Sequence, residues 1–106
     1  MEHVFVALAA VGKELSLLSL PPFSEETLAM ILQVDLSSEW GAFPQKYAVL
    51  WREGEAPLQL PLAGGTAAIR KAFFEKETPF YLHILGKNGK KRLSTNQVCG
   101  RFVRKN

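Results

Sequence analysis

Short segments in which apolar and polar residues alternate recur along the chain, and this period of two is typical of β-strands that bury one face. The alternation is clearest over residues 32–36 and 58–62. Residues 79–85 are nearly all apolar and are followed by a turn signal, so we expect a central strand there. Turn residues recur every ~8–12 positions, and the pattern predicts about seven or eight short antiparallel strands in a β-sandwich or small barrel.

Glycine and proline mark where these strands begin and end. Gly12-Lys13 separates two apolar segments, and Asn88-Gly89 is a strong hairpin signal between two others. Pro57 lies directly before the alternating segment at 58–62, and Pro61 lies within it. Since proline has no N–H to donate to a neighbouring strand, we expect either that this segment is an edge strand or that the prolines mark strand ends.

Thr27–Leu36 has two competing interpretations. Its apolar residues have spacings that a helix tolerates, and Ser24 is placed to cap such a helix. Its second half, however, alternates with period two, which an amphipathic helix does not do. We therefore favour a strand.

Two further segments have room for short helical turns. Ser37 is placed to cap a single turn over Ser37–Gly41, which would carry Trp40 to the core. The segment around Phe73 and Phe74 has room for one or two turns. We expect Trp40 and one of these two phenylalanines to be buried.

The composition is that of an ordinary globular protein. The 106 residues are 47% hydrophobic and 22% charged, which fits a single domain over residues 1–106. No apolar run approaches the ~20 residues that cross a bilayer. The apolar run at 4–11 follows Glu2 and lacks the basic residues of an export signal, so we expect an intracellular product. Cys99 is the single cysteine, which excludes an intramolecular disulfide and disfavours a zinc site, and its apolar neighbours predict a buried thiol.

Acidic and basic residues are distributed unevenly. All ten acidic residues lie at or before Glu77, whereas seven basic residues follow it. Either a basic strand pair lies beside acidic neighbours, or the excess forms a positive patch for an acidic partner or nucleic acid. Phe80, Tyr81 and Phe102 would then be stacking faces, although their alternation favours the core. The basic residues of this segment are Lys87, Lys90, Lys91, Arg92, Arg101, Arg104 and Lys105.

Residues suited to catalysis are few. His3 and His83 are the two histidines, and neither lies in a motif that indicates a general base. Acidic pairs such as Glu25-Glu26 fall on expected turns, where carboxylates are usually solvated. Gly64-Gly65 lacks the Gly-Lys-Ser/Thr of a phosphate loop. Gly86 and Gly89 have the Gly-x-x-Gly spacing of an RNA-binding loop, but that loop lies between helices, whereas here we expect strands on both sides. We therefore expect a chain that is not an enzyme and that uses no cofactor and no metal.

Four stretches carry a resemblance to a known family. They are Val34–Trp40 (VDLSSEW), Tyr47–Trp51 (YAVLW), Leu58–Leu62 (LQLPL) and Leu82–Asn96, which ends in Arg-Leu-Ser-Thr-Asn before the last strand. Together, residues 28–103 resemble a small immunoglobulin-like β-sandwich domain of tail and baseplate-associated structural proteins of phages and prophages of Gram-positive bacteria. The chain departs from that pattern at residues 69–71, Ile-Arg-Lys, where the family has an Ile-Pro-Trp-like start to a short helix.

The resemblance implies an all-β, immunoglobulin-like β-sandwich of about seven or eight short antiparallel strands with one short helical turn. It also implies a virion protein, made in the bacterial host cytoplasm, that binds other phage structural proteins and forms a homo-oligomer. Relatives often continue into a fibre or receptor-binding region, whereas this sequence stops at Asn106, so we expect a free-standing adaptor or a fragment. Two alternatives stay open. One is a small basic nucleic-acid-binding protein that uses the 87–105 patch, and the other is a carbohydrate-binding sandwich with Trp51 as a sugar platform.

A surplus of large aromatic residues indicates an interaction surface. Trp51 lies at a strand end beside Arg52, and aromatic residues and arginine are typical of interface hot spots. Exposed edge strands offer a second means of association, by strand addition. The predicted partner-binding residues are Trp51, Arg52, Lys87, Lys90, Lys91, Arg92, Arg101 and Arg104.

Overall fold

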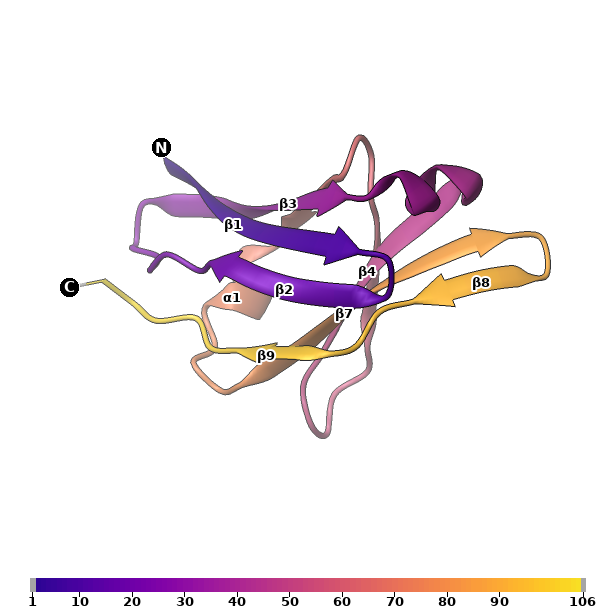
Figure 1. Ribbon diagram of the computed structural model, residues 1–106. Coiled ribbons are helices and arrows are strands. Elements are labelled where there is room, and N and C mark those ends of the chain that lie inside the picture. Colours follow the sequence, from indigo (N-terminus) through magenta and orange to yellow (C-terminus); the bar gives the residue numbers. More distant parts are fainter. Residues whose placement is uncertain (1, 106) are drawn as a thin grey trace.

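Two β-sheets pack face to face in the computed structural model, which describes residues 2–105 (Figure 1). The first sheet has the strand order β2-β1-β3-β6, and its strands are β1 (Glu2–Val11), β2 (Glu14–Ser19), β3 (Thr27–Leu36) and β6 (Thr66–Ile69). The second has the order β5-β4-β7-β8 with β9 also paired to β7, and its strands are β4 (Gln45–Trp51), β5 (Leu58–Pro61), β7 (Phe80–Asn88), β8 (Lys91–Ser94) and β9 (Val98–Gly100). The predicted all-β sandwich is confirmed, with nine strands in the described part of the chain, where about seven or eight were expected.

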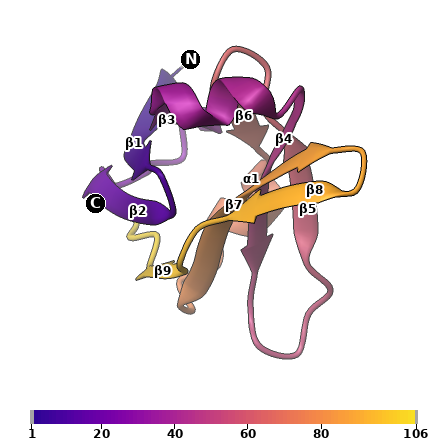
Figure 2. The same ribbon diagram turned by 45° about the vertical axis from the view of Figure 1, so that its right-hand side comes forward.

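The core fills the space between the two layers, which Figure 2 shows side by side. Its centre is built by inward-facing residues of both sheets, namely Val6, Leu8, Leu32, Leu50, Leu82 and Ile84. Trp40 is fully buried, as predicted, and its indole N–H donates a hydrogen bond to the carbonyl oxygen of Gly12 at 3.1 Å. Phe73 and Phe74 are both buried, where one had been expected inside.

Both predicted hairpins are confirmed. β1 and β2 are joined at Gly12-Lys13, and Gly12 has a φ of 58°, in the left-handed region that favours glycine. β7 and β8 form the second hairpin, but its turn is Gly89-Lys90, one residue later than the Asn88-Gly89 pair suggested. The predicted edge position of the segment near Leu58 is also confirmed, because β5 ends the strand order of its sheet.

One strand pair differs from the predicted antiparallel arrangement. β1 and β3 pair in parallel, with Phe5 opposite Ile31 and Ala9 opposite Asp35. The β1–β2 hairpin returns the chain to the end of the sheet where β1 begins, and residues 20–26 carry it past that end. Because β3 starts there, beside the free edge of β1, it must run in the same direction as β1.

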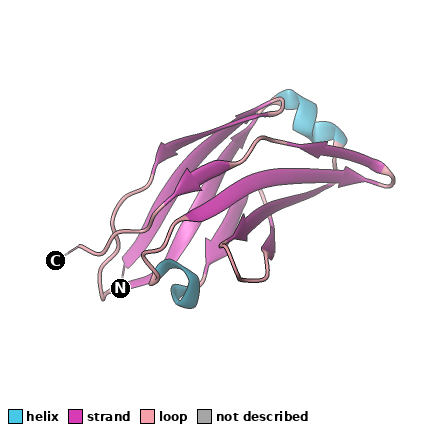
Figure 3. Ribbon diagram, turned by 90° about the horizontal axis from the view of Figure 1, so that it is seen from below, coloured by secondary structure: helices cyan, strands magenta, loops and turns pink. Residues whose placement is uncertain are grey.

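The chain has two short helical segments within residues 2–105, one in each of the two stretches where the sequence leaves room for a helical turn, whereas the family resemblance implies one. The 3-10 helix η1 (Ser38–Ala42) and the single-turn α1 (Lys71–Phe74) lie at opposite ends of the strands (Figure 3). Ser37 is the N-cap residue of η1, as predicted, but its side chain makes no capping hydrogen bond. Its hydroxyl instead accepts a hydrogen bond from the backbone N–H of Gly12 and donates one to Glu39. The alternative helix after Ser24 does not form, since β3 occupies that segment. No helix in this part of the chain is long and apolar enough to cross a membrane.

Candidate interaction surfaces

The outer face of the second sheet carries a row of aromatic and apolar side chains. Ala48 and Leu50 of β4 are buried, so the residues that alternate with them face away from the core. The register between β4 and β7 pairs each of these outward residues with an outward residue of β7. We call the resulting six residues the aromatic stripe: Tyr47 with Leu85, Val49 with His83, and Trp51 with Tyr81. Val49, at the centre of the stripe, is buried by its neighbours, and the other five side chains are partly exposed.

Trp51 and Tyr81 form the end of the stripe. Their rings stack with centroids 4.5 Å apart and planes inclined by 23°. The indole N–H of Trp51 donates a hydrogen bond to the side-chain oxygen of Gln97 at 2.9 Å, which holds the ring in place. Trp51 therefore lies on an outer face, as expected for a surface anchor, and it remains partly exposed. Its stacking partner Tyr81 covers one face of the indole.

The opposite end of the stripe is basic. Lys87 of β7 pairs directly with Arg92 of β8, and the ammonium of Lys87 lies 5.3 Å from the centre of the Tyr47 ring. Lys90 and Lys91 are exposed at the tip of the same hairpin. None of these four cations forms an ion pair within 4 Å to a residue that the structure describes. The hairpin thus gathers four predicted partner-binding residues in one place.

Arg101 and Arg104 lie away from this hairpin. They follow β9 near the C-terminal end of the described chain, at the other end of the sandwich from the β7–β8 turn (Figure 1). The guanidinium of Arg104 lies 4.8 Å from the centre of the Phe23 ring, and its backbone N–H donates to Glu77 at 3.3 Å. The continuous patch predicted over 87–105 is therefore divided between two ends of the molecule.

The structure places Arg52 in the interior, which corrects its prediction as a surface contact. The side chain is 2% exposed, and its guanidinium lies 4.0 Å from the centre of the Phe73 ring. Nε and Nη2 donate hydrogen bonds to the carbonyl oxygens of Thr78 at 3.3 Å and Lys76 at 2.9 Å. Burial lowers the pKa of Arg52 from its ordinary value, while the carboxylate of Glu55 acts in the opposite direction. Arg52 holds the loop between α1 and β7 in place and cannot touch a partner.

The aromatic residues considered for nucleic-acid stacking are divided between the two faces of the sheet. Phe80 and Phe102 are buried, with rings stacked 4.4 Å apart, whereas Tyr81 faces outward.

The prediction that Cys99 is a buried thiol is wrong, because Cys99 is exposed. It pairs with Tyr81 and so lies on the outward side of the sheet.

The two histidines considered for catalysis lie in different sheets. His83 lies in the stripe with its Nδ1 atom buried and without a hydrogen-bond partner in the described structure, and burial lowers its pKa below the usual value. His3 is exposed on β1, much earlier in the sequence than His83 and in the first sheet. Among the described residues, no three His, Cys, Asp or Glu side chains cluster as a metal site would require.

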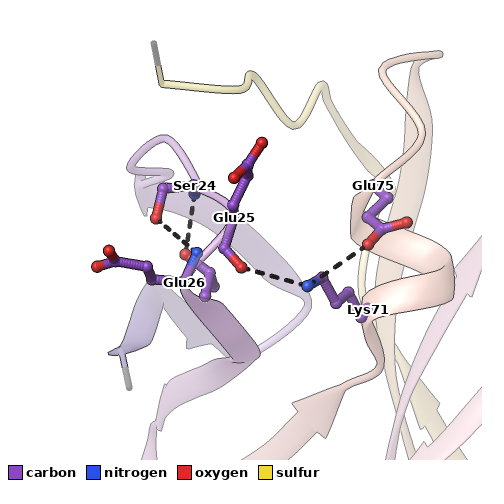
Figure 4. A network of polar contacts seen from close by, with 6 residues as sticks. Ser24, Glu25, Glu26, Lys71 and Glu75 are labelled. Carbon is purple, nitrogen blue, oxygen red and sulfur yellow. Dashed lines mark hydrogen bonds and ion pairs between the residues drawn. The ribbon is translucent and has the colours of Figure 1, made fainter.

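The acidic residues of the β2–β3 loop take part in a structural network (Figure 4). The ammonium of Lys71 contacts the carbonyl oxygen of Glu25 at 3.3 Å and the carboxylate of Glu75 at 3.8 Å. Ser24 accepts a hydrogen bond from the backbone N–H of Glu26 at 3.2 Å. These contacts tie the loop to α1. Because they are exposed, they are worth at most about 1 kcal/mol.

The outer face of the first sheet is a surface that the sequence analysis did not identify. Phe5 is 48% exposed and Val11 is 67% exposed, and between them Ala7 and Ala9 also face outward. The signal in the sequence is that the run at 4–11 is apolar at every position, whereas a strand with one solvated face alternates. A strand that is apolar on both faces requires cover on both faces or exposes an apolar surface.

No known protein family and no curated protein matches the sequence. Among solved structures, the fold is similar to the N-terminal domain of phage TP901-1 ORF48, with a TM-score of 0.52 and 11% sequence identity. The similarity covers 99% of this chain and 100% of that domain. At this identity the likeness establishes a shared fold over the whole chain.

Proposed function

We propose that the chain is a non-catalytic structural or adaptor domain of a phage or prophage particle, which acts in the tail or baseplate by binding other proteins of the particle. The observation that carries the proposal is the similarity of fold, from end to end, to a domain of a phage protein. The resemblance of residues 28–103 to immunoglobulin-like domains of phage structural proteins supports the same setting. The protein would be made in the host cytoplasm and reside in the virion.

Two features of the surface support binding as the mechanism. The aromatic stripe is a row of partly exposed rings fixed by stacking and by the Trp51–Gln97 hydrogen bond, so little side-chain entropy is lost when a partner covers it. The basic hairpin at one end of the stripe supplies charges that orient an acidic partner. Complementary surfaces repeated over many copies are sufficient for such a role, and no step of it requires a catalytic group.

The composition of purified particles tests this function. In a strain that carries the gene, mass spectrometry of particles released after prophage induction is expected to detect the chain in a constant ratio to the tail proteins. Tail and lysis genes are expected beside its gene. Particles that contain every tail protein but not this chain, or a gene surrounded only by metabolic genes, would overturn the proposal.

Binding of single-stranded nucleic acid is the second candidate function. It is favoured by the position of Lys87 beside the Tyr47 ring, with Arg92 paired to Lys87, since cations next to an aromatic face suit a phosphate backbone and its bases. Replacing Lys90, Lys91 and Arg92 together by glutamate is then expected to abolish binding and its dependence on salt. Binding that persists unchanged in this variant contradicts the candidate.

A further inference from the structure

We propose that copies of this chain associate face to back, with the aromatic stripe of one copy packed against the outer face of the first sheet of the next copy. This inference rests on the proposed function, because it specifies how an assembly domain contacts its own kind. It is argued from the size and the charge of the two outer faces.

The outer face of the first sheet carries four alanines beside the larger outward residues Phe5, Ile31 and Gln33. Its outward positions are set by the burial of Val6 and Leu8 in β1, and the register of β1 with β3 and of β3 with β6 aligns them in rows. Phe5, Ile31 and Ala68 form one such row across three strands. We call six of the apolar outward residues the alanine face: Phe5, Ala7, Ala9, Ala29, Ile31 and Ala68.

The two faces are complementary in size. Ala7 and Ala9 leave the outer side of β1 shallow, whereas the stripe presents the large rings of Tyr47, Trp51 and Tyr81. Large rings fit against a surface of small residues without opening voids, and packed sheet faces gain stability from such interdigitation. Two alanine faces, or two aromatic stripes, would not fit each other in this way.

The two faces are also complementary in charge. The charged side chains at described outward strand positions of the first sheet are Glu14 and Asp35, both exposed acids. On the second sheet the corresponding residues are Lys87 and Arg92. Each copy therefore presents an acidic corner on one side and a basic corner on the other.

The acidic and basic corners lie at the same end of the sandwich. η1 follows β3 directly, and the side-chain amide of Asn88 donates a hydrogen bond to the carbonyl oxygen of Ala42 at its end. Asp35, near the end of β3, and Lys87, near the end of β7, are thus at one end of the molecule. Two copies in the same orientation, stacked face to back, bring the acidic corner of one against the basic corner of the other.

The same stacking brings the apolar rows together. Ile31 lies four residues before Asp35 in β3, and His83 lies four residues before Lys87 in β7. At about 3.3 Å per residue, each row lies about 13 Å from its charged corner. A contact that joins two different faces leaves one of each kind free on every dimer, so it repeats into a ring or a filament.

Sedimentation velocity and light scattering over a concentration series test the inference on the full chain. The wild-type protein is expected to exceed its 11.8 kDa monomer mass increasingly as concentration rises. Reversing the basic corner (Lys87→Glu with Arg92→Glu) or the acidic corner (Glu14→Lys with Asp35→Lys) is expected to weaken association at least about tenfold. A chain that carries all four changes is expected to associate again.

The matched control reverses two charges at the tip of the same hairpin, Lys90→Glu with Lys91→Glu. These residues belong to neither face, so association is expected to persist, and circular dichroism verifies the fold of every variant. A strict monomer at all concentrations, failure of the fourfold variant to associate, or equal loss in the control overturns the inference. If the chain is found in particles but the purified chain is a monomer, face-to-back stacking is refuted and the proposed function stands. If the purified chain associates but is absent from particles, the proposed function is refuted and face-to-back stacking stands.

Discussion

The side chain of Asn96 pairs with the backbone of Leu15 as a neighbouring strand would. Its Oδ1 accepts a hydrogen bond from the N–H of Leu15 at 2.8 Å, and its Nδ2 donates one to the carbonyl oxygen of Leu15 at 3.3 Å. The backbone N–H of Asn96 donates a third bond to Lys13 at 3.1 Å. Because Leu15 belongs to the first sheet and Asn96 lies between β8 and β9 of the second, one amide joins the two layers at the edge of β2.

Replacing Asn96 by alanine is expected to lower the free energy of unfolding by about 1–3 kcal/mol, because both polar groups of Leu15 lose their partner at once. Urea denaturation measures the change. Ser94→Ala is the matched control, since the hydroxyl of this exposed residue makes only a 3.4 Å contact to Thr95 and its loss should be nearly neutral. Equal stability of the Asn96 variant and the wild type would show that water replaces the amide without cost.

Gly65 is expected to tolerate alanine much less well than its neighbour Gly64. Both have positive φ, 78° and 59°, so alanine at either position costs about 1–2 kcal/mol of backbone strain. At Gly65 a Cβ atom would also lie 2.8 Å from the carbonyl oxygen of Val34, whereas nothing lies within 4 Å at Gly64. The Gly65 variant should lose about 1–3 kcal/mol more in thermal or urea unfolding. Equal losses in the two variants would show that the backbone at Val34 shifts away from the added Cβ atom at no further cost.

Much of the fold could be predicted from the sequence because its signals are local. The alternation at 32–36 requires one strand face inside and one outside, and Gly12 and Gly89 mark turns that few other residues allow. The parallel pairing of β1 with β3 could not be predicted in this way. It depends on β3 pairing with the free edge of β1 and not with the free edge of β2, and no local sequence pattern determines that choice.

The candidate surface could be predicted only in part, because exposure is a tertiary property. The hairpin cations follow a turn and are exposed as expected. Arg52 looks like a surface residue in sequence, yet the loop at 75–79, more than twenty residues later, folds over it and supplies two carbonyl acceptors. Cys99 lies in a strand of three residues, too short for alternation to reveal which face it occupies.

Arg52→Lys is expected to destabilise the protein by about 1–3 kcal/mol, although it conserves the charge. The planar guanidinium reaches the carbonyl oxygens of Lys76 and Thr78 together and lies over the Phe73 ring, and a lysine ammonium cannot satisfy all three contacts. Lys76→Ala is the control, because its side chain makes only an exposed ion pair with Glu55 at 3.2 Å and its carbonyl oxygen is retained. If both variants unfold at the same denaturant concentration, the role assigned to Arg52 is wrong.

His83 is expected to make stability depend on pH near neutrality. Burial lowers its pKa in the folded protein, so between that value and the unfolded value of about 6.5 the unfolded chain binds more protons than the folded one. The contribution of His83 is therefore fully present above about pH 6.5 and is lost as the pH falls through the folded pKa. Urea midpoints measured at intervals from about pH 7.5 down to about pH 5.5 should decline in the wild type, and His83→Gln should remove that part of the decline. Parallel pH profiles for the wild type and the His83 variant would instead assign the dependence to other groups.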